Sequence, residues 1–343
     1  MIGNKYGIAY VDSSFLLTRN TWMATKDKQP EEMEPGSIIR LTIQTLRKLS
    51  REWGITASKI LLIGDQWSRD YGGYYTNYLI KDFQIYKGSR KFITEQDLED
   101  MRCNPNVTQE ELDKAIREFY MNRTKFAAKK AMKEDFKDIG VYYYGKDGYE
   151  FDNIATLAAF QRWGHTDKPD VIITKDSDLQ YSLTPGPNGT VFFSLPTKGS
   201  EPKVITYEEM YETIPQVLRD RGVSLYMYNA YLNAFGKGHN DLGRCLKPGV
   251  DHVEAILHIL DGNYSDINNV DFFNAQIKSY DLGCYPGIEE VQRAIANDFE
   301  TKGKLGTLDD FHMFCLKHGV NGISDRYYSD FISTFDPKFF TDR

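Results

Sequence analysis

Residues 171–179 read VIITKDSDL, a short uncharged apolar run that leads into two aspartates. Such a run predicts a buried strand with Asp176 and Asp178 at its carboxyl end. Three further segments repeat this association of an apolar run with a nearby acid, so six acidic residues lie at predicted strand ends or helix starts. The other four are Asp12 in YGIAYVDSS (6–14), Asp65 in KILLIGDQW (59–67), and Glu150 and Asp152 in YEFDNIATLAA (149–159).

The order of these runs predicts the fold class. The apolar runs GIAYV, KILLIG, DIGVYYY and DVIIT alternate with helical patterns at 37–53, about 108–137 and 151–163. Alternation of this kind predicts an α/β fold with a mostly parallel central sheet, flanked by helices and joined by right-handed crossovers. Sites in open α/β sheets form at the carboxyl ends of strands, so we expect Asp12, Asp65 and Asp176 to converge.

The rest of the chain adds an insert, a hairpin and a helical region. Residues 92–137 are long, polar and charge-rich for a crossover, with little obvious core face, and predict a mobile cover or arch. VFFSLP and KVI, separated by a TKGSEP turn, predict a hairpin. From about residue 207 the pattern is helical and loop-rich, and DHVEAILHIL (251–260) opens with an N-cap Asp.

Composition excludes several classes of protein. The chain has 343 residues, 41% hydrophobic and 27% charged, as in ordinary globular proteins. Its four cysteines form no CxxC pair and its six histidines no HExxH pair, which disfavours a zinc site or a disulfide scaffold and suits a reducing cytosol. No apolar stretch approaches the roughly 20 residues that cross a bilayer, and a strand near the N-terminus disfavours a signal peptide.

A net charge of −7 is unexpected for a nucleic-acid enzyme, but the charges are segregated. Residues 114–137 hold eight basic side chains against three acidic ones. This stretch is either a nucleic-acid contact or an ordinary solvated helix face, and the charge run alone leaves both open.

Clustered carboxylates at the end of a sheet need cations, because burying an unpaired charge is costly. Hard divalent ions bound by carboxylate oxygens meet that need, and Mg²⁺ is the commonest. Two such ions about 4 Å apart activate water and stabilise the leaving oxygen in phosphodiester hydrolysis, so the acids predict a nuclease. The alternative for any single block is that its acid merely caps the following helix.

At four segments the sequence resembles the flap endonuclease, or 5′-nuclease, superfamily, in particular the T-even phage type of ribonuclease H, a 5′-to-3′ exonuclease. The segments are LLIGDQWSRDYGGYY with the downstream YKGSR, then GYEFDNIATLAA, VIITKDSDLQYSL and AFGKGHNDLG. Their order and spacing fit over about residues 7 to 262. The resemblance implies a PIN-like core with a helical arch insertion and a helix–three-turn–helix region.

The resemblance also implies two metal sites, each holding Mg²⁺, for which Mn²⁺ can substitute. The first metal would be held by Asp12, Asp65, Glu150 and Asp152. The second would be held by Asp176, Asp178 and Asp241, with Asp152 or Asp176 near both ions. In this chain Asn153, Lys237 and Asn240 stand where the family commonly has acids, which puts the second site in doubt; Asp266 is a reserve candidate for Asp241.

Nucleic-acid contacts follow from the same resemblance. Lys87 and Arg90, with Lys91 beside them, match residues at the base of the arch that contact the scissile phosphate and stabilise its charge. The helix–hairpin segment, with Gly236, Lys237 and Gly238, would grip duplex backbone through main-chain amides, together with a monovalent cation such as K⁺. Arch residues that could track phosphates are Arg117, Arg123, Lys125, Lys129 and Lys130.

The sequence thus predicts a catalytic domain over residues 1–200, a DNA-binding region over 201–300 and a helical tail over 301–343. The expected protein is a cytoplasmic monomer in a phage-infected bacterial cell that acts on branched or nicked DNA or RNA–DNA hybrids with a free 5′ end. Candidate partners are a single-strand-binding protein and a sliding clamp, which would dock on aromatics of TFDPKFFTDR (334–343); the favoured alternative is that those aromatics pack on the chain itself. Alternative hypotheses are a PIN-like ribonuclease for single-stranded RNA and a catalytically silent DNA-binding protein.

Overall fold

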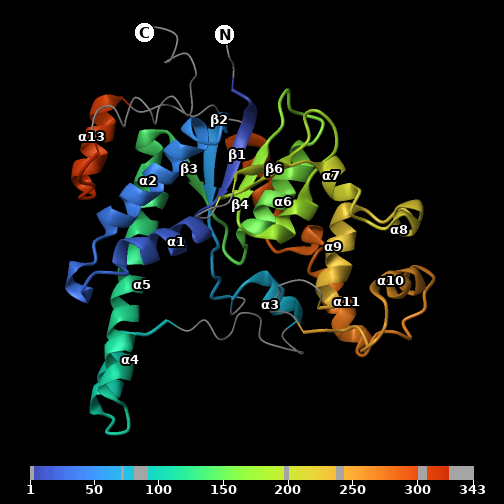
Figure 1. The fold of residues 1–343 in the computed structure, drawn as a ribbon, viewed down its shortest axis with the longest axis horizontal. Coiled ribbons are helices and arrows are strands. Elements are labelled where there is room, and N and C mark those ends of the chain that lie inside the picture. Colours follow the sequence, from blue (N-terminus) through green and yellow to red (C-terminus); the bar gives the residue numbers. More distant parts are fainter. Residues whose placement is uncertain are drawn as a thin grey trace.

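The fold is built around one six-stranded sheet (Figure 1). The structure, a computed structural model, describes residues 4–70, 73–80, 92–196, 201–236, 243–299 and 307–323. The strands are β1 (Tyr6–Asp12), β2 (Ala57–Ile63), β3 (Val141–Tyr144), β4 (Val171–Thr174), β5 (Val191–Ser194) and β6 (Lys203–Ile205). Neighbours pair in parallel except β5 and β6, which form the predicted antiparallel hairpin. The predicted α/β class with a mostly parallel sheet is therefore confirmed.

Helices connect and cover the strands. They are α1 (Ser13–Thr25), α2 (Pro35–Arg51), α3 (Tyr75–Ile80), α4 (Glu95–Cys103), α5 (Gln109–Asp135), α6 (Phe151–Arg162), α7 (Tyr207–Tyr211), α8 (Gln216–Asp220), α9 (Leu225–Ala234), α10 (His252–Leu260), α11 (Val270–Lys278), α12 (Ile288–Ala294) and α13 (Leu308–Lys317). Shorter turns are η1 (Pro30–Glu32), η2 (Phe136–Ile139), η3 (Ser177–Ser182), η4 (Leu282–Cys284) and η5 (Ile295–Phe299). The predicted helices match α2, α5, α6 and α10, whereas α1 was not predicted. No helix of the described segments combines the length and apolar character that a membrane crossing requires.

The sheet is buried on both faces, as its mostly uncharged strands predict. Successive side chains of β1 alternate between two cores: Ile8 and Tyr10 belong to one, Ala9 and Val11 to the other. Helices α1, α2, α5 and α13 cover the second face, and α6 with the helical region covers the first (Figure 1).

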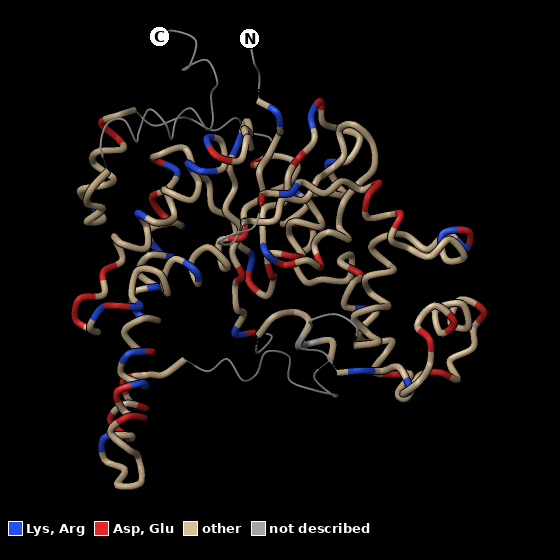
Figure 2. The backbone as a smooth tube through the Cα atoms, in the orientation of Figure 1, with Lys and Arg blue, Asp and Glu red and all other residues tan. Residues whose placement is uncertain are grey.

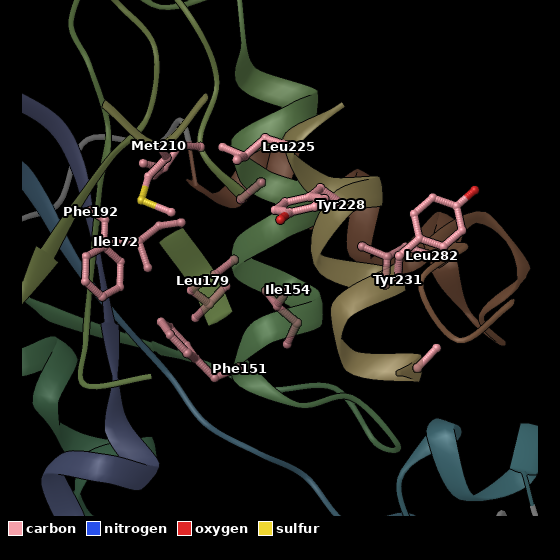
Figure 3. Close-up of a cluster of buried hydrophobic side chains, with 14 of the residues drawn as sticks. Phe151, Ile154, Ile172, Leu179, Phe192, Met210, Leu225, Tyr228, Tyr231 and Leu282 are labelled. Carbon is pink, nitrogen blue, oxygen red and sulfur yellow. The ribbon is translucent and has the colours of Figure 1, made fainter. Parts of the chain in front are cut away.

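The helical region and the sheet share one hydrophobic core. Figure 3 shows Phe151 and Ile154 of α6 beside Leu179, with Tyr228 of α9 on the far side. The same core reaches Phe273 of α11. Packing therefore fixes the helical region against α6 and η3.

The insert between β2 and β3 has two parts. Helix α4 packs against α5, and Phe92 meets Phe126 edge to face at 5.0 Å between ring centroids. Together they project away from the sheet (Figure 1), where the arch is expected. The second half of α5 differs from the expectation of little core face, because Ala128, Ala131 and Met132 are buried against α1 and α2.

The strand order locates the site. Its sequence, β3-β2-β1-β4-β5-β6, reverses direction between β1 and β4. Connections on the two sides of such a switch point diverge, which opens a crevice outside the carboxyl ends of the two strands. The residues that follow β1 and β4 are therefore those that the fold presents to a ligand.

Candidate active site

Asp12 lies at this switch point, as the last residue of β1. It is 9% exposed and caps α1, since its Oδ1 accepts a hydrogen bond from the Phe15 amide at 2.9 Å. Helix capping, the alternative considered for each acid, is thus a role that Asp12 fulfils. Capping uses one carboxylate oxygen and leaves the other to face β4.

The hydroxyl of Thr174 joins Asp12 to Asp176. Thr174 ends β4 and is fully buried. Its Oγ1 donates to Asp12 Oδ2 at 2.9 Å and accepts from the Asp176 amide at 3.1 Å. One buried hydroxyl therefore fixes the acids of β1 and β4 relative to each other, a role that the sequence did not indicate.

Asp65 connects the end of β2 to the start of α6. Its Oδ1 accepts from the Phe151 amide at 2.9 Å, between the acidic neighbours Glu150 and Asp152. Glu150 is buried at the N-cap of α6, and its amide donates to Asn153 Oδ1 at 2.9 Å. Asn153, which departs from the family pattern, thus has a structural role in capping this helix.

The charges of these acids affect one another. Burial, then the nearby carboxylates of Asp65 and Asp176, raise the pKa of Asp12 to about 7. Hydrogen bonds from Phe15 and Thr174 act in the opposite direction but are outweighed. At neutral pH Asp12 is therefore poised between its charged and neutral forms, and a nearby cation would favour the charged one.

Asp178 faces the helical region. Its Oδ2 accepts from Asn233 Nδ2 at 3.2 Å, and its carbonyl accepts from Asn229 Nδ2 at 3.4 Å. Both asparagines are buried on α9. Asp178 thus links the acidic edge of the sheet to α9, which sequence spacing did not indicate.

Acidic residues gather at the centre of the molecule, where the strands end (Figure 2). Among the described residues, no three His, Cys, Asp or Glu side chains lie close enough together to form a ready-made metal site. The donor set nevertheless fits Mg²⁺, because it consists of carboxylate oxygens around a buried acid whose raised pKa a cation would lower. Asp12, Asp65 and Asp176 are the acids whose charges interact most directly at this edge of the sheet.

Lys129 of α5 brings a positive charge to this edge. Its Nζ donates to the carbonyl oxygen of Asp65 at 2.8 Å. Burial lowers the pKa of Lys129, while the carboxylate of Asp65 opposes this shift. The ammonium is therefore fixed beside the acids. On a solvated helix face, the alternative that the sequence left open, it would extend into solvent.

Comparisons with known proteins give a fold likeness only. No protein-family model matches the chain, and no curated protein matches its sequence. A bacteriophage T5 protein co-crystallised with metal ions aligns with a TM-score of 0.44 and 15% identity, covering 96% of this chain and 99% of that one. The bacteriophage T5 flap endonuclease in a complex with DNA and metal ions aligns with a TM-score of 0.43 and 15% identity, covering 96% of this chain and 99% of that one. The T5 5′-exonuclease with bound zinc aligns with a TM-score of 0.43 and 16% identity, covering 96% of this chain and all of that one.

The remaining basic residues of α5 differ in their surroundings. Arg117 donates to the carbonyls of Thr25, Lys26 and Lys28 at 2.6 to 3.0 Å, so it holds the chain after α1. These bonds account for Arg117 without a nucleic acid. Lys125 Nζ donates to Thr18 Oγ1 at 2.7 Å. Two further members of the predicted set, Arg123 and Lys130, are exposed.

Several predicted contacts lie outside the described residues: Lys87, Arg90, Lys91, Lys237, Gly238, Asn240, Asp241 and the aromatics Phe335, Phe339 and Phe340. Gly236 is described and has a φ of +70° at the end of α9. An added Cβ there would lie 2.9 Å from Arg244 Cβ, so both backbone and space favour glycine. The reserve candidate Asp266 pairs with His258 Nδ1 at 2.7 Å.

Replacing Lys129 by Met is expected to lower kcat about 10-fold or more, because it removes a preorganised charge beside the acids. Lys130→Met is the matched control on the same helix, and should change only the salt dependence of substrate binding. Steady-state kinetics on a labelled oligonucleotide with Mg²⁺ at several salt concentrations would measure both. Equal effects of the two variants would show that Lys129 acts as a general surface charge.

Proposed function

We propose that this chain is a divalent-metal-dependent nuclease of the 5′-nuclease type, which hydrolyses phosphodiesters in structured nucleic acids with a free 5′ end. The observation that supports this most directly is the position of Asp12. It is buried at the switch point, beside Asp65 and Asp176, with a pKa raised to about 7. Such a charged arrangement costs stability and is typical of a functional site.

The proposed site divides its work between metal ions and side chains. When bound, divalent ions would supply an activated water and stabilise the leaving oxygen. Asp12, Asp65, Glu150 and Asp152 would hold the first ion, and Asp176, Asp178 and Asp241 the second. Thr174 positions two of these acids through its hydroxyl. Lys129 would stabilise charge on the phosphoryl oxygens from the α5 side, with Lys87 and Arg90 acting at the base of the arch.

The surroundings of the acids support this substrate class. On one side α4 and α5 project beyond the sheet, carrying exposed Arg123 and Lys130 (Figures 1 and 2). On the other, α9 contacts Asp178 and leads to the segment that resembles a duplex-gripping hairpin. A single strand at α5 and a duplex at α9 would meet at the carboxylates, which suits flaps, nicks and RNA–DNA hybrids.

Incubation with labelled substrates tests this function. With Mg²⁺ we expect cleavage of 5′-flap DNA and of the RNA strand of a hybrid, with little cleavage of blunt duplex and none in EDTA. Product lengths on a denaturing gel separate mononucleotide release from cleavage at the branch. The same gel distinguishes exonucleolytic from endonucleolytic action and DNA from RNA preference.

Two other outcomes correspond to the alternative hypotheses. Metal-dependent cleavage of single-stranded RNA alone would identify a PIN-like ribonuclease. Binding of flap DNA without cleavage in either Mg²⁺ or Mn²⁺ would identify a silent DNA-binding protein and contradict the proposal.

A further inference from the structure

An exposed aromatic pair lies beside the proposed catalytic acids. Trp67, two residues after Asp65, is 51% exposed, whereas the next residue, Ser68, is buried. Its ring meets that of Tyr74 edge to face, with centroids 5.6 Å apart and planes at 71°. A single exposed aromatic needs no ligand to explain it. Trp67 differs from an isolated exposed aromatic in its position near Asp65 and in its contact with Tyr74.

A small antiparallel bridge holds the pair together. The amide of Ser68 donates to the Gly73 carbonyl at 3.0 Å, and the Gly73 amide donates back at 2.9 Å. In such a pairing the residues just outside the bridge, Trp67 and Tyr74, lie directly opposite with their side chains close. The ring of Tyr74 therefore contacts the indole, which is still 51% exposed.

The backbone on both sides of the pair is also fixed. Gln66 donates to the Tyr149 carbonyl at 3.0 Å and accepts from the Gly148 amide at 2.9 Å. Tyr75 donates to the Gly148 carbonyl at 2.8 Å, and its buried ring packs on Tyr285. The aromatic pair is thus held by the segment that leads into the acids of α6.

From alternation along the chain we infer that the indole lies on the same side as the carboxylate of Asp65. Gln66 directs its amide toward Tyr143, with Nε2 3.5 Å from the Tyr143 hydroxyl. Gln66 pairs through both its N–H and its C=O, as a strand residue does, so the side chains before and after it should point the opposite way, which puts Asp65 and Trp67 on one face. The Cα atoms of Asp65 and Trp67 would be about 7 Å apart, at a rise of about 3.3 Å per residue.

We propose that Trp67, supported by Tyr74, stacks against an unpaired nucleobase next to the phosphate that the acids bind. An exposed, immobilised indole suits this ligand because every base offers a flat π face, whatever its sequence. The contact would favour substrates whose base is unstacked at this position. This inference rests on the proposed function and adds a determinant of substrate structure to it.

Binding measurements without cleavage test the role of Trp67. Fluorescence anisotropy of a labelled 5′-flap oligonucleotide, with Ca²⁺ in place of Mg²⁺, gives Kd for each variant. Trp67→Ala should weaken binding about 10-fold, and Trp67→Tyr should restore most of the loss. Trp163→Ala is the matched control: Trp163 has the same 51% exposure but lies at the far end of α6 from the acids, and its loss should leave Kd unchanged.

An abasic substitution separates stacking from general packing. One abasic site, moved through the first unpaired positions, should weaken wild-type binding at a single position. For Trp67→Ala, the same abasic oligonucleotide should bind with the same Kd as the intact one, because the stacking contact is already lost. Additive penalties would overturn the stacking contact even if the enzyme cleaves flaps normally. Failure of the wild type to bind any oligonucleotide would overturn both this inference and the proposed function.

Discussion

Asp12→Asn is expected to make the metal-free protein more stable while abolishing its activity. Burial and two neighbouring carboxylates raise the pKa of Asp12 to about 7, from a usual value of 3.8. At about 1.4 kcal/mol per tenfold change, ionising it in the folded chain costs up to about 4 kcal/mol. Asparagine has the same shape and can still cap α1, so the variant avoids this cost. The expected gain in Tm is about 5 °C at pH 8.

The sign of the pH dependence follows from linkage. A raised folded-state pKa means that the wild type loses stability, relative to the variant, as pH rises from about 4 to about 7. The two proteins should therefore melt alike near pH 3 and differ fully above pH 7. Melting in EDTA across this range measures the difference. A gap in Tm that does not change with pH would show that ionisation of Asp12 is not its cause.

Asp12→Ala provides the control for capping. Alanine removes the charge but also the hydrogen bond to the Phe15 amide, at a cost of about 1 kcal/mol. Its Tm at pH 8 should lie between those of the wild type and Asp12→Asn. Addition of Mg²⁺ should stabilise the wild type more than either variant, because an ion bound to the folded state adds its binding free energy.

Asp176→Asn is expected to reduce cleavage about 1000-fold without loss of fold. Metal-ion catalysis contributes several kcal/mol to the transition state, and the lost carboxylate would hold one of the ions. The turn should survive, because an asparagine oxygen can still accept from the Asp178 amide, as Asp176 Oδ1 does at 3.0 Å. Single-turnover cleavage of the flap substrate, together with circular dichroism, tests both statements.

Asp266→Asn is the matched control for Asp176→Asn. It makes the same chemical change at the reserve candidate for the second site, where the carboxylate pairs with His258. Cleavage should be unchanged in this variant. Near-normal activity of Asp176→Asn would show that the proposed metal site is wrongly assigned.

The parallel sheet could be predicted because its strands carry a strong signal. The buried strands are short runs of mostly uncharged residues, and the helices α2, α5 and α6 between them are long enough to recognise. Helix α1 was missed because its buried face is partly polar. Asn20, Thr21 and Thr25 are buried there, and Asn20 Nδ2 donates to Thr42 Oγ1 at 3.0 Å. Hydrogen bonds thus replace the apolar periodicity by which a helix is recognised.

The site could be predicted only as far as chain topology determines it. Parallel strands bring their carboxyl ends together, which is why Asp12 and Asp176 were expected to converge. The hydrogen bonds of the Thr174 hydroxyl depend on the register between β1 and β4, and the contact of Lys129 with Asp65 depends on how α5 packs. Neither can be predicted from a single sequence. The same charge run contains Lys129 beside the acids and Arg117 bound to backbone carbonyls, and composition cannot distinguish these roles.

The core shared by the sheet and the helical region has a consequence for the products. Because Ile154, Tyr228 and Phe273 belong to one packed cluster, the helical region cannot shift relative to the acids without opening a cavity. The hydrogen bond from Asn233 of α9 to the carboxylate of Asp178 further fixes α9 against the edge of the sheet. Under the proposed function, a duplex bound at α9 would lie at a fixed distance from the acids, and the cut would fall a constant number of nucleotides from the branch.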